Sequence, residues 1–203
     1  VKAAGGRIWS PYFKNLTPES LAEARQLGLQ VSVWTPDSPD DLKKLISRQT
    51  RLVAFTHASN VIGTVNPVRE ITGFVHSMGG LVCVDAVAYA PHRLIDVHEW
   101  DVDFYVFSFY KTYGPHYAML YGKKKILLDL PGNNHFFIGR EEVPYKFQPG
   151  HVNFEFAWGM TGLVDYLEQL DHHHFPGAGQ DPVRTRLERV FGLISRHEHQ
   201  LSR

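Results

Sequence analysis

The sequence lacks most of the features that mark a secreted, membrane or nucleic-acid-binding protein. It has one cysteine, Cys83, among 203 residues, so no disulfide can form within the chain and a reducing, cytoplasmic compartment is expected. Its 21 basic and 21 acidic residues leave no net charge, which argues against nucleic acid or an anionic membrane as the main partner. No apolar run approaches the ~18 residues of a membrane span, and no signal peptide opens the chain.

The length and composition are those of a globular protein with one sizeable core. Hydrophobic residues make up 43% and charged residues 21% of the chain, both ordinary values. We therefore predict a single α/β domain over residues 1–203. The chain starts at Val1 and stops at Arg203, inside an amphipathic pattern without a C-cap signal, so we expect it to be a piece of a longer protein.

Apolar runs and helical patterns alternate along most of the chain. The runs are continuous rather than alternating, as is typical of strands buried on both faces. We predict a mainly parallel sheet with helices on both faces. The expected strands are 30–34, 52–56, 81–85, 102–107 and 118–121, and the expected helices are 18–27, 38–47, 67–78, 154–170 and 182–203. Residues 131–150 and 171–180 are expected to be loops.

Two polar residues follow neighbouring predicted strands. Asp85 closes the run LVCV at 81–84, and Lys111 stands just past FYVF at 104–107. In open α/β sheets, ligands bind at the carboxyl ends of the strands. A lysine there can form a Schiff base and an aspartate can hold a protonated ring nitrogen, which are the two groups that pyridoxal phosphate needs most.

Several ordered motifs surround these two residues at consistent spacing. They are TRLVA at 50–54, SNVIGT at 59–64, VDAV at 84–87, YAPH at 89–92, DF at 103–104, YK at 110–111, YGPH at 113–116 and PGHVN at 149–153. From about residue 50 to 203 the chain resembles the class V aminotransferase family of fold-type I pyridoxal-phosphate enzymes, most closely its cysteine desulfurase-like branch. The resemblance implies the core of a fold-type I large domain, with a leading segment at 1–48, a cofactor-binding core at 49–170, and a loop and terminal helix at 171–203 that lead to a small domain.

The resemblance assigns catalytic and cofactor-binding roles. Lys111 would be the Schiff-base lysine, and Asp85 would pair with the pyridinium nitrogen. Asn60 would bond the ring hydroxyl. Taken alone, Lys111 could equally be a surface lysine, Asp85 a cap, and Asn60 a turn residue.

Three further positions match the family's phosphate contacts, with departures. Ser108 matches a phosphate-binding serine, although it could also be a turn residue. Tyr110 stands where many desulfurases carry a histidine, and His151 where the family often has a threonine that reaches the partner subunit's phosphate. Ala88 replaces a usual histidine or glutamine and so removes one polar contact near the ring hydroxyl.

The implied function is pyridoxal-phosphate chemistry on an amino acid, most closely that of a cysteine desulfurase, in a homodimer. An aminotransferase, an epimerase, a β-lyase or a non-catalytic dimerising remnant stays open. The small domain, which carries the substrate-carboxylate arginine and the desulfurase cysteine, is absent. Cys83 lies inside a strand and should be buried, and no motif aims Arg140, Arg184 or Arg186 at the cofactor.

Two other patterns stay secondary. Residues 7–46, with WSPY at 9–12, LTPE at 16–19 and VSVWT at 31–35, resemble the end of a glycerophosphodiester phosphodiesterase, but that family's His-Arg-Gly start and acidic metal ligands are missing. The histidines at 172–174 invite a metal interpretation. Consecutive residues do not converge on one ion, so we expect a solvated loop and no metal site.

Overall fold

The computed structural model describes residues 1–34, 36, 38–132, 135–148, 150–177 and 181–202. The chain divides into two compact units, Val1–Ser47 and Arg48–Arg203. The six residues that the sequence proposes for the site all lie in the second unit.

The first unit contains a small parallel pair of strands and two helices. Its elements are η1 (Lys2–Ala4), β1 (Ile8–Trp9), η2 (Phe13–Asn15), α1 (Pro18–Gln26), β2 (Gln30–Val31) and α2 (Pro39–Leu45). As predicted, Thr17 caps α1, and Gly28 follows its end with a φ of 66°, a conformation that glycine adopts without strain. The strand predicted at 30–34 is shorter, because only an isolated bridge from Trp34 to Tyr12 follows β2. Of the two predicted caps of α2, Ser38 accepts the cap hydrogen bond, and residue 37 lies outside the described residues.

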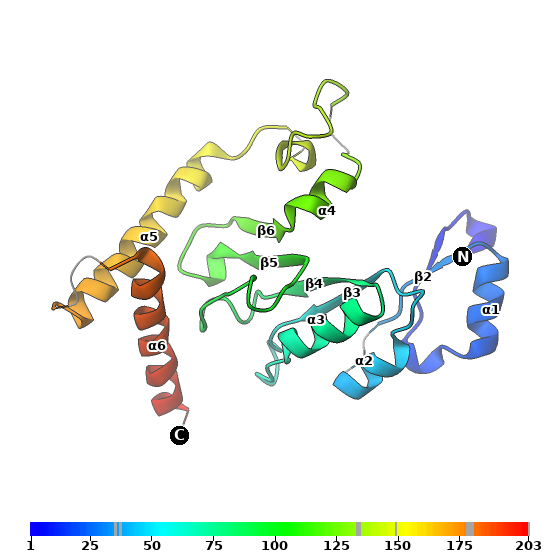
Figure 1. Ribbon diagram of the computed structural model, residues 1–203, viewed down its shortest axis with the longest axis horizontal. Coiled ribbons are helices and arrows are strands. Elements are labelled where there is room, and N and C mark those ends of the chain that lie inside the picture. The colour runs from blue at the N-terminus through cyan, green and yellow to red at the C-terminus, as the bar shows by residue number, and fades with distance from the viewer. Residues whose placement is uncertain (35, 37, 133–134, 149, 178–180, 203) are drawn as a thin grey trace. The chain divides into compact units, whose positions relative to one another are not determined.

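The second unit is built on a four-stranded sheet in the order β3-β4-β5-β6 (Figure 1). Its elements are β3 (Leu52–Thr56), α3 (Val68–Ser77), β4 (Leu81–Asp85), β5 (Phe104–Ser108), η3 (Phe109–Lys111), β6 (Ala118–Gly122), α4 (Lys124–Asp129), η4 (Tyr145–Phe147), α5 (Phe154–His174) and α6 (Val183–Leu201). The first three strands run parallel and β6 is antiparallel to β5. The predicted α/β class with a mainly parallel sheet is therefore confirmed.

Burial along the central strands alternates instead of being continuous. Val82 and Val84 of β4 are fully buried, as is Tyr105 of β5, whereas the residues between them are half-buried. The continuous apolar runs predicted equal burial of both faces, and that prediction was too simple. Helix α3 lies along the sheet (Figure 1) and contacts β4 through an apolar stripe that includes the fully buried Val75.

Helices α5 and α6 pack together as a hairpin. Leu167 of α5 and Val190 and Phe191 of α6 form a small core, against which Leu94 from the segment after β4 also packs. The prediction that the first of these helices ends at residue 170 was wrong, since α5 continues to His174.

Asp171 explains the longer helix. Its buried carboxylate receives two hydrogen bonds from Arg189 of α6, at 2.9 and 2.8 Å. This ion pair holds the last turn of α5 in place, so the three histidines lie on a helix rather than in a loop. Among the described residues, no group of three or more histidine, cysteine or acidic side chains is placed to hold a metal ion.

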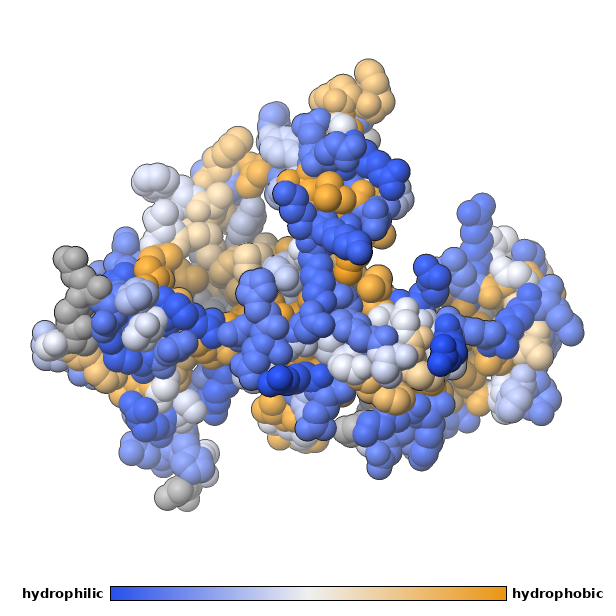
Figure 2. Space-filling model, viewed as in Figure 1, coloured by the Kyte–Doolittle hydropathy of each residue, from blue (hydrophilic) through white to orange (hydrophobic). Residues whose placement is uncertain are grey.

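The loop predicted at 131–150 contains only the short η4, and the helix α4 before it was not predicted. Hydrophobic residues lie on the surface of this loop at the top of Figure 2, where Phe136 is fully exposed and Phe137 is 68% exposed. None of the described helices combines the length and the apolarity that a membrane crossing requires.

Candidate functional site

Three parallel strands bring their carboxyl ends to one edge of the sheet. Thr56 at the end of β3 is paired with Asp85 at the end of β4, and Asp85 is paired with Val106 of β5. The segments that follow these strands therefore start side by side, as the spacing of Asp85 and Lys111 predicted.

A cavity of about 590 Å³ lies among these segments. Asn60 comes from the turn after β3 and Lys111 from η3 after β5, so the structure brings two of the predicted site residues into one cavity. The described lining consists of Ala58, Ser59, Asn60, Gly63, Val65, Val87, Ala88, Tyr89, Pro91, His92, Arg93, Lys111 and Glu198.

Asp85 adjoins this cavity through its backbone neighbours. Its side chain is exposed, and Oδ1 accepts a hydrogen bond of 2.9 Å from the N–H of Val87, which lines the cavity. Its carbonyl accepts a further bond of 2.7 Å from the N–H of His57. The carboxylate is thus held at the strand end with its second oxygen available.

Lys111 is exposed at the end of η3. Its Nζ lies 5.8 Å from the centroid of the Tyr110 ring, and it makes no ion pair with the part of the chain that the structure describes. Tyr110 itself is 48% exposed and stacks on His116 at 5.2 Å between ring centroids. A lysine amine with no acidic partner is available for covalent chemistry.

The other predicted phosphate contacts are not brought into the cavity. Ser108 ends β5 as the N-cap of η3, but its side chain makes no capping hydrogen bond. His151 is exposed just before α5, with its ring 6.4 Å from that of Phe154. Neither residue lines the cavity, and both assignments stay predictions.

Sequence reasoning missed a buried aromatic cluster beside the cavity, centred on His57. The His57 ring is 3% exposed, shares a 2.8 Å hydrogen bond with the hydroxyl of Tyr105, and stacks on the cavity-lining Tyr89 at 3.5 Å. Burial lowers the pKa of His57 to about 4, so it is neutral at physiological pH. A polar residue directly after an apolar strand was the only signal for it.

The sequence also gave no warning of the charged rim of the cavity. Glu198 of α6 accepts hydrogen bonds from Nδ1 of His92 at 2.6 Å and from Nη1 of Arg93 at 2.7 Å. Partial burial favours the neutral acid, but these two bonds outweigh it and lower the pKa of Glu198. Glu198 lies more than 100 residues after its partners, a separation at which no local pattern predicts a contact.

Cys83 is half-buried in β4 rather than fully buried as predicted. Burial, and then the nearby charge of Asp85, raise the pKa of its thiol. The thiolate is therefore disfavoured at neutral pH.

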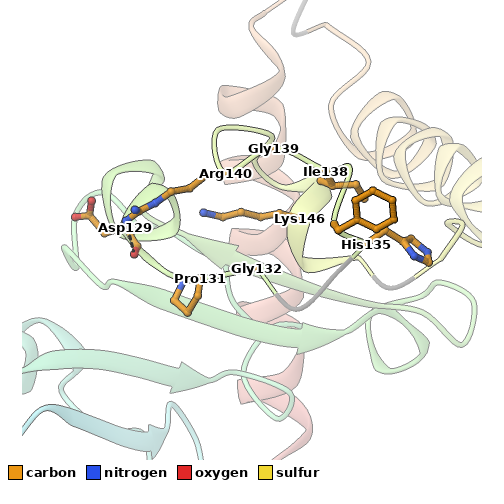
Figure 3. A pocket seen from close by; sticks show the side chains of 9 residues that line it. Asp129, Pro131, Gly132, His135, Ile138, Gly139, Arg140 and Lys146 are labelled. Carbon is orange, nitrogen blue, oxygen red and sulfur yellow. Dashed lines mark hydrogen bonds between the residues drawn. The ribbon is translucent and has the colours of Figure 1, made fainter.

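A second cavity, of about 550 Å³, lies in the loop after α4 (Figure 3). The buried Lys146 points into it and donates to the carbonyls of Leu128 and Leu130, at 3.1 and 2.7 Å. Arg140 donates to the carbonyls of Leu128 and Asp129. Both cations are thus engaged by backbone oxygens at the end of α4, which assigns this cavity a structural role.

Comparison with known proteins agrees with the motifs. The family model described as "Aminotransferase class-V" matches residues 18–180. The chain is 42% identical over 158 residues to the cysteine desulfurase-like protein ustD of Aspergillus flavus, covering 71% of this chain and 36% of that protein. It is 38% identical over 176 residues to the aminotransferase-like protein FGM3 of Gibberella zeae, covering 83% and 40%.

A solved structure shows the same fold. The cysteine desulfurase CsdA of Escherichia coli, in its S-sulfonic acid form, superposes with a TM-score of 0.60 at 30% identity, over 79% of this chain and 45% of that one. The chain therefore spans less than half the length of the relatives it matches. The resemblance of residues 7–46 to a phosphodiesterase gains no support, because the family match begins inside that segment. By sequence and by fold, the chain belongs to the class V aminotransferase family.

Proposed function

We propose that the chain carries the cofactor site of a pyridoxal-phosphate-dependent enzyme that acts on an amino acid. The observation that supports this most directly is the shared cavity of Asn60 and Lys111, with Asp85 beside it at the carboxyl edge of the parallel sheet. The family is known for this cofactor, and the residue types present suit it.

The side chains fit the cofactor's chemical demands. The Lys111 amine would attach it covalently, and the amide of Asn60 could bond its ring hydroxyl. The Asp85 carboxylate would keep its ring nitrogen protonated. When bound, pyridoxal phosphate supplies an electron sink for charge that develops on the substrate carbons. Ala88 offers no polar contact, so this ring hydroxyl has one partner fewer than is usual in the family.

Lys111 would have a second task once the substrate amine has taken its place. Its free amine would then work as a general base and acid, moving a proton at the substrate carbons. The open cavity around it leaves room for a substrate, and no acidic partner from the described chain binds its Nζ.

Within this class, we propose a cysteine desulfurase-like activity for the whole protein. The names of the relatives support that branch, although one of them is named aminotransferase-like. An aminotransferase, epimerase or β-lyase would use the same cofactor residues. The half-buried Cys83, with its raised thiol pKa, is a poor nucleophile for sulfur transfer, so this segment alone should not desulfurate cysteine. A homodimeric assembly and a cytoplasmic location belong to the same proposal.

A spectroscopic experiment tests the cofactor proposal. The purified chain, incubated with pyridoxal phosphate and dialysed, should be yellow, and borohydride should abolish that absorbance. Lys111→Ala should remain colourless after dialysis, whereas the control Lys125→Ala should behave as the wild type. A wild-type chain that stays colourless would favour the non-catalytic remnant instead.

A further inference from the structure

The rim of the Lys111 cavity contains an arginine that none of the expected roles uses. Arg93 lies eight residues after Asp85, in the segment that follows β4, and lines the same cavity as Lys111 and Asn60. Its side chain is 40% exposed. It therefore combines a fixed positive charge with access to the cavity.

Two neighbours fix the guanidinium of Arg93. Nη1 donates to the carbonyl of His92 and to Oε2 of Glu198, each at 2.7 Å. These two bonds use both hydrogens of Nη1. Glu198 is held in turn by His92 and by its place on α6, so the arginine is anchored from two elements.

The opposite edge of the guanidinium has no partner in the described chain. Nε and Nη2 make no hydrogen bond with the residues that the structure describes. Together they form a side-on fork, the geometry with which arginine binds a carboxylate through two parallel hydrogen bonds. A fork that is already anchored loses little side-chain entropy when it binds.

The other arginines that the sequence offered are engaged elsewhere. Arg140 caps the end of α4, Arg184 pairs with Asp96, and Arg186 pairs with Glu168. None of these three lines the Lys111 cavity. Among the described arginines, Arg93 alone does.

We propose that the Nε–Nη2 edge of Arg93 binds a carboxylate of the amino-acid substrate. This inference rests on the proposed function, because it takes the Lys111 cavity as the place where the substrate amine meets the cofactor. The carboxylate comes either from the α-carbon or from an acidic side chain, since both offer the same two oxygens.

The test follows the cofactor absorbance of the loaded chain during titration with three amines. L-Alanine has an α-carboxylate, L-aspartate has an additional acidic group, and ethylamine has none. Arg93→Gln should weaken binding of a carboxylate-bearing amine about tenfold to a hundredfold, the usual range for a charge-assisted pair. It should leave ethylamine binding and cofactor affinity unchanged. Arg93→Lys, which retains the charge without the fork, should fall in between.

The outcomes separate the two carboxylates and the two proposals. A loss for L-aspartate alone assigns the side-chain group, and an equal loss for L-alanine and L-aspartate assigns the α-carboxylate. Equal weakening of all three amines, no change in any, or a loss of cofactor affinity would overturn the role of Arg93. Arg184→Gln, outside the cavity, is the matched control. If the wild-type chain shows no cofactor absorbance, the proposed function itself has failed, and this inference with it.

Discussion

At the scale of single residues, Asp85 is the group whose chemistry can be isolated most cleanly. Asp85→Asn keeps the shape and the acceptor for the Val87 N–H but removes the negative charge that favours a protonated ring nitrogen. We expect the pH midpoint of the bound cofactor's absorbance change to fall by about one unit, which corresponds to ~1.4 kcal/mol. Cofactor affinity should change much less.

The exposed Asp165→Asn on α5 serves as the control for that titration. A midpoint in the Asp85 variant that equals the wild-type value would remove Asp85 from its assigned role.

Cys83 gives a second prediction at this scale. Because burial and Asp85 raise the pKa of its thiol, alkylation by iodoacetamide should have its pH midpoint above that of free cysteine. Incubation with cysteine and pyridoxal phosphate should leave negligible persulfide on Cys83, as measured by thiol-blocking mass analysis. A stoichiometric persulfide would show that this segment can transfer sulfur on its own.

At the scale of elements, the contact between α3 and β4 holds the sheet edge that carries the site. Val75 is fully buried in this contact. Val75→Ala should lower the free energy of unfolding by about 2 kcal/mol through lost burial and a residual cavity. Glu70→Ala, on the exposed side of α3, should change it by less than about 0.5 kcal/mol. Urea denaturation measures both, and equal values would contradict the packing described.

The pairing of α5 with α6 should depend on acid. The hydrogen bonds and charge of Arg189 lower the pKa of Asp171 below its usual 3.8. A carboxyl with a lowered pKa in the folded state adds stability above its unfolded pKa and loses it as the pH falls through the folded value. Melting temperatures below about pH 4 should therefore decline less steeply in Asp171→Asn than in the wild type. An unchanged acid slope would show that the ion pair contributes nothing.

The elements also show what sequence could and could not supply. β3 and β4 match their predicted bounds, because short apolar runs bounded by turns and glycines are strong local signals. The end of α5 was misplaced because the stabilising partner, Arg189, lies on another helix. The burial of alternate residues in β4 was missed for the same reason, since the packing of each face is a tertiary property.

At the scale of the whole molecule, the same division holds for the site. Asp85, Asn60 and Lys111 could be proposed from motifs, because strand ends and turns fix them locally. The His57 cluster and the Arg93–Glu198 pair could not, because they arise only when β3, β5, the segment after β4, and α6 come together. The remaining assignments, Ser108, Tyr110 and His151, lie outside the cavity lining and stay predictions.

The central claim is that Lys111 is the covalent attachment point of the cofactor, and peptide mapping tests it most directly. The chain would be loaded with pyridoxal phosphate, reduced with borohydride, digested and analysed by mass spectrometry. We predict a single pyridoxyl adduct on Lys111, the lysine that shares a cavity with Asn60, and its loss in Lys111→Ala. An adduct on Lys123, Lys124 or Lys125 in its place would contradict this account of the site.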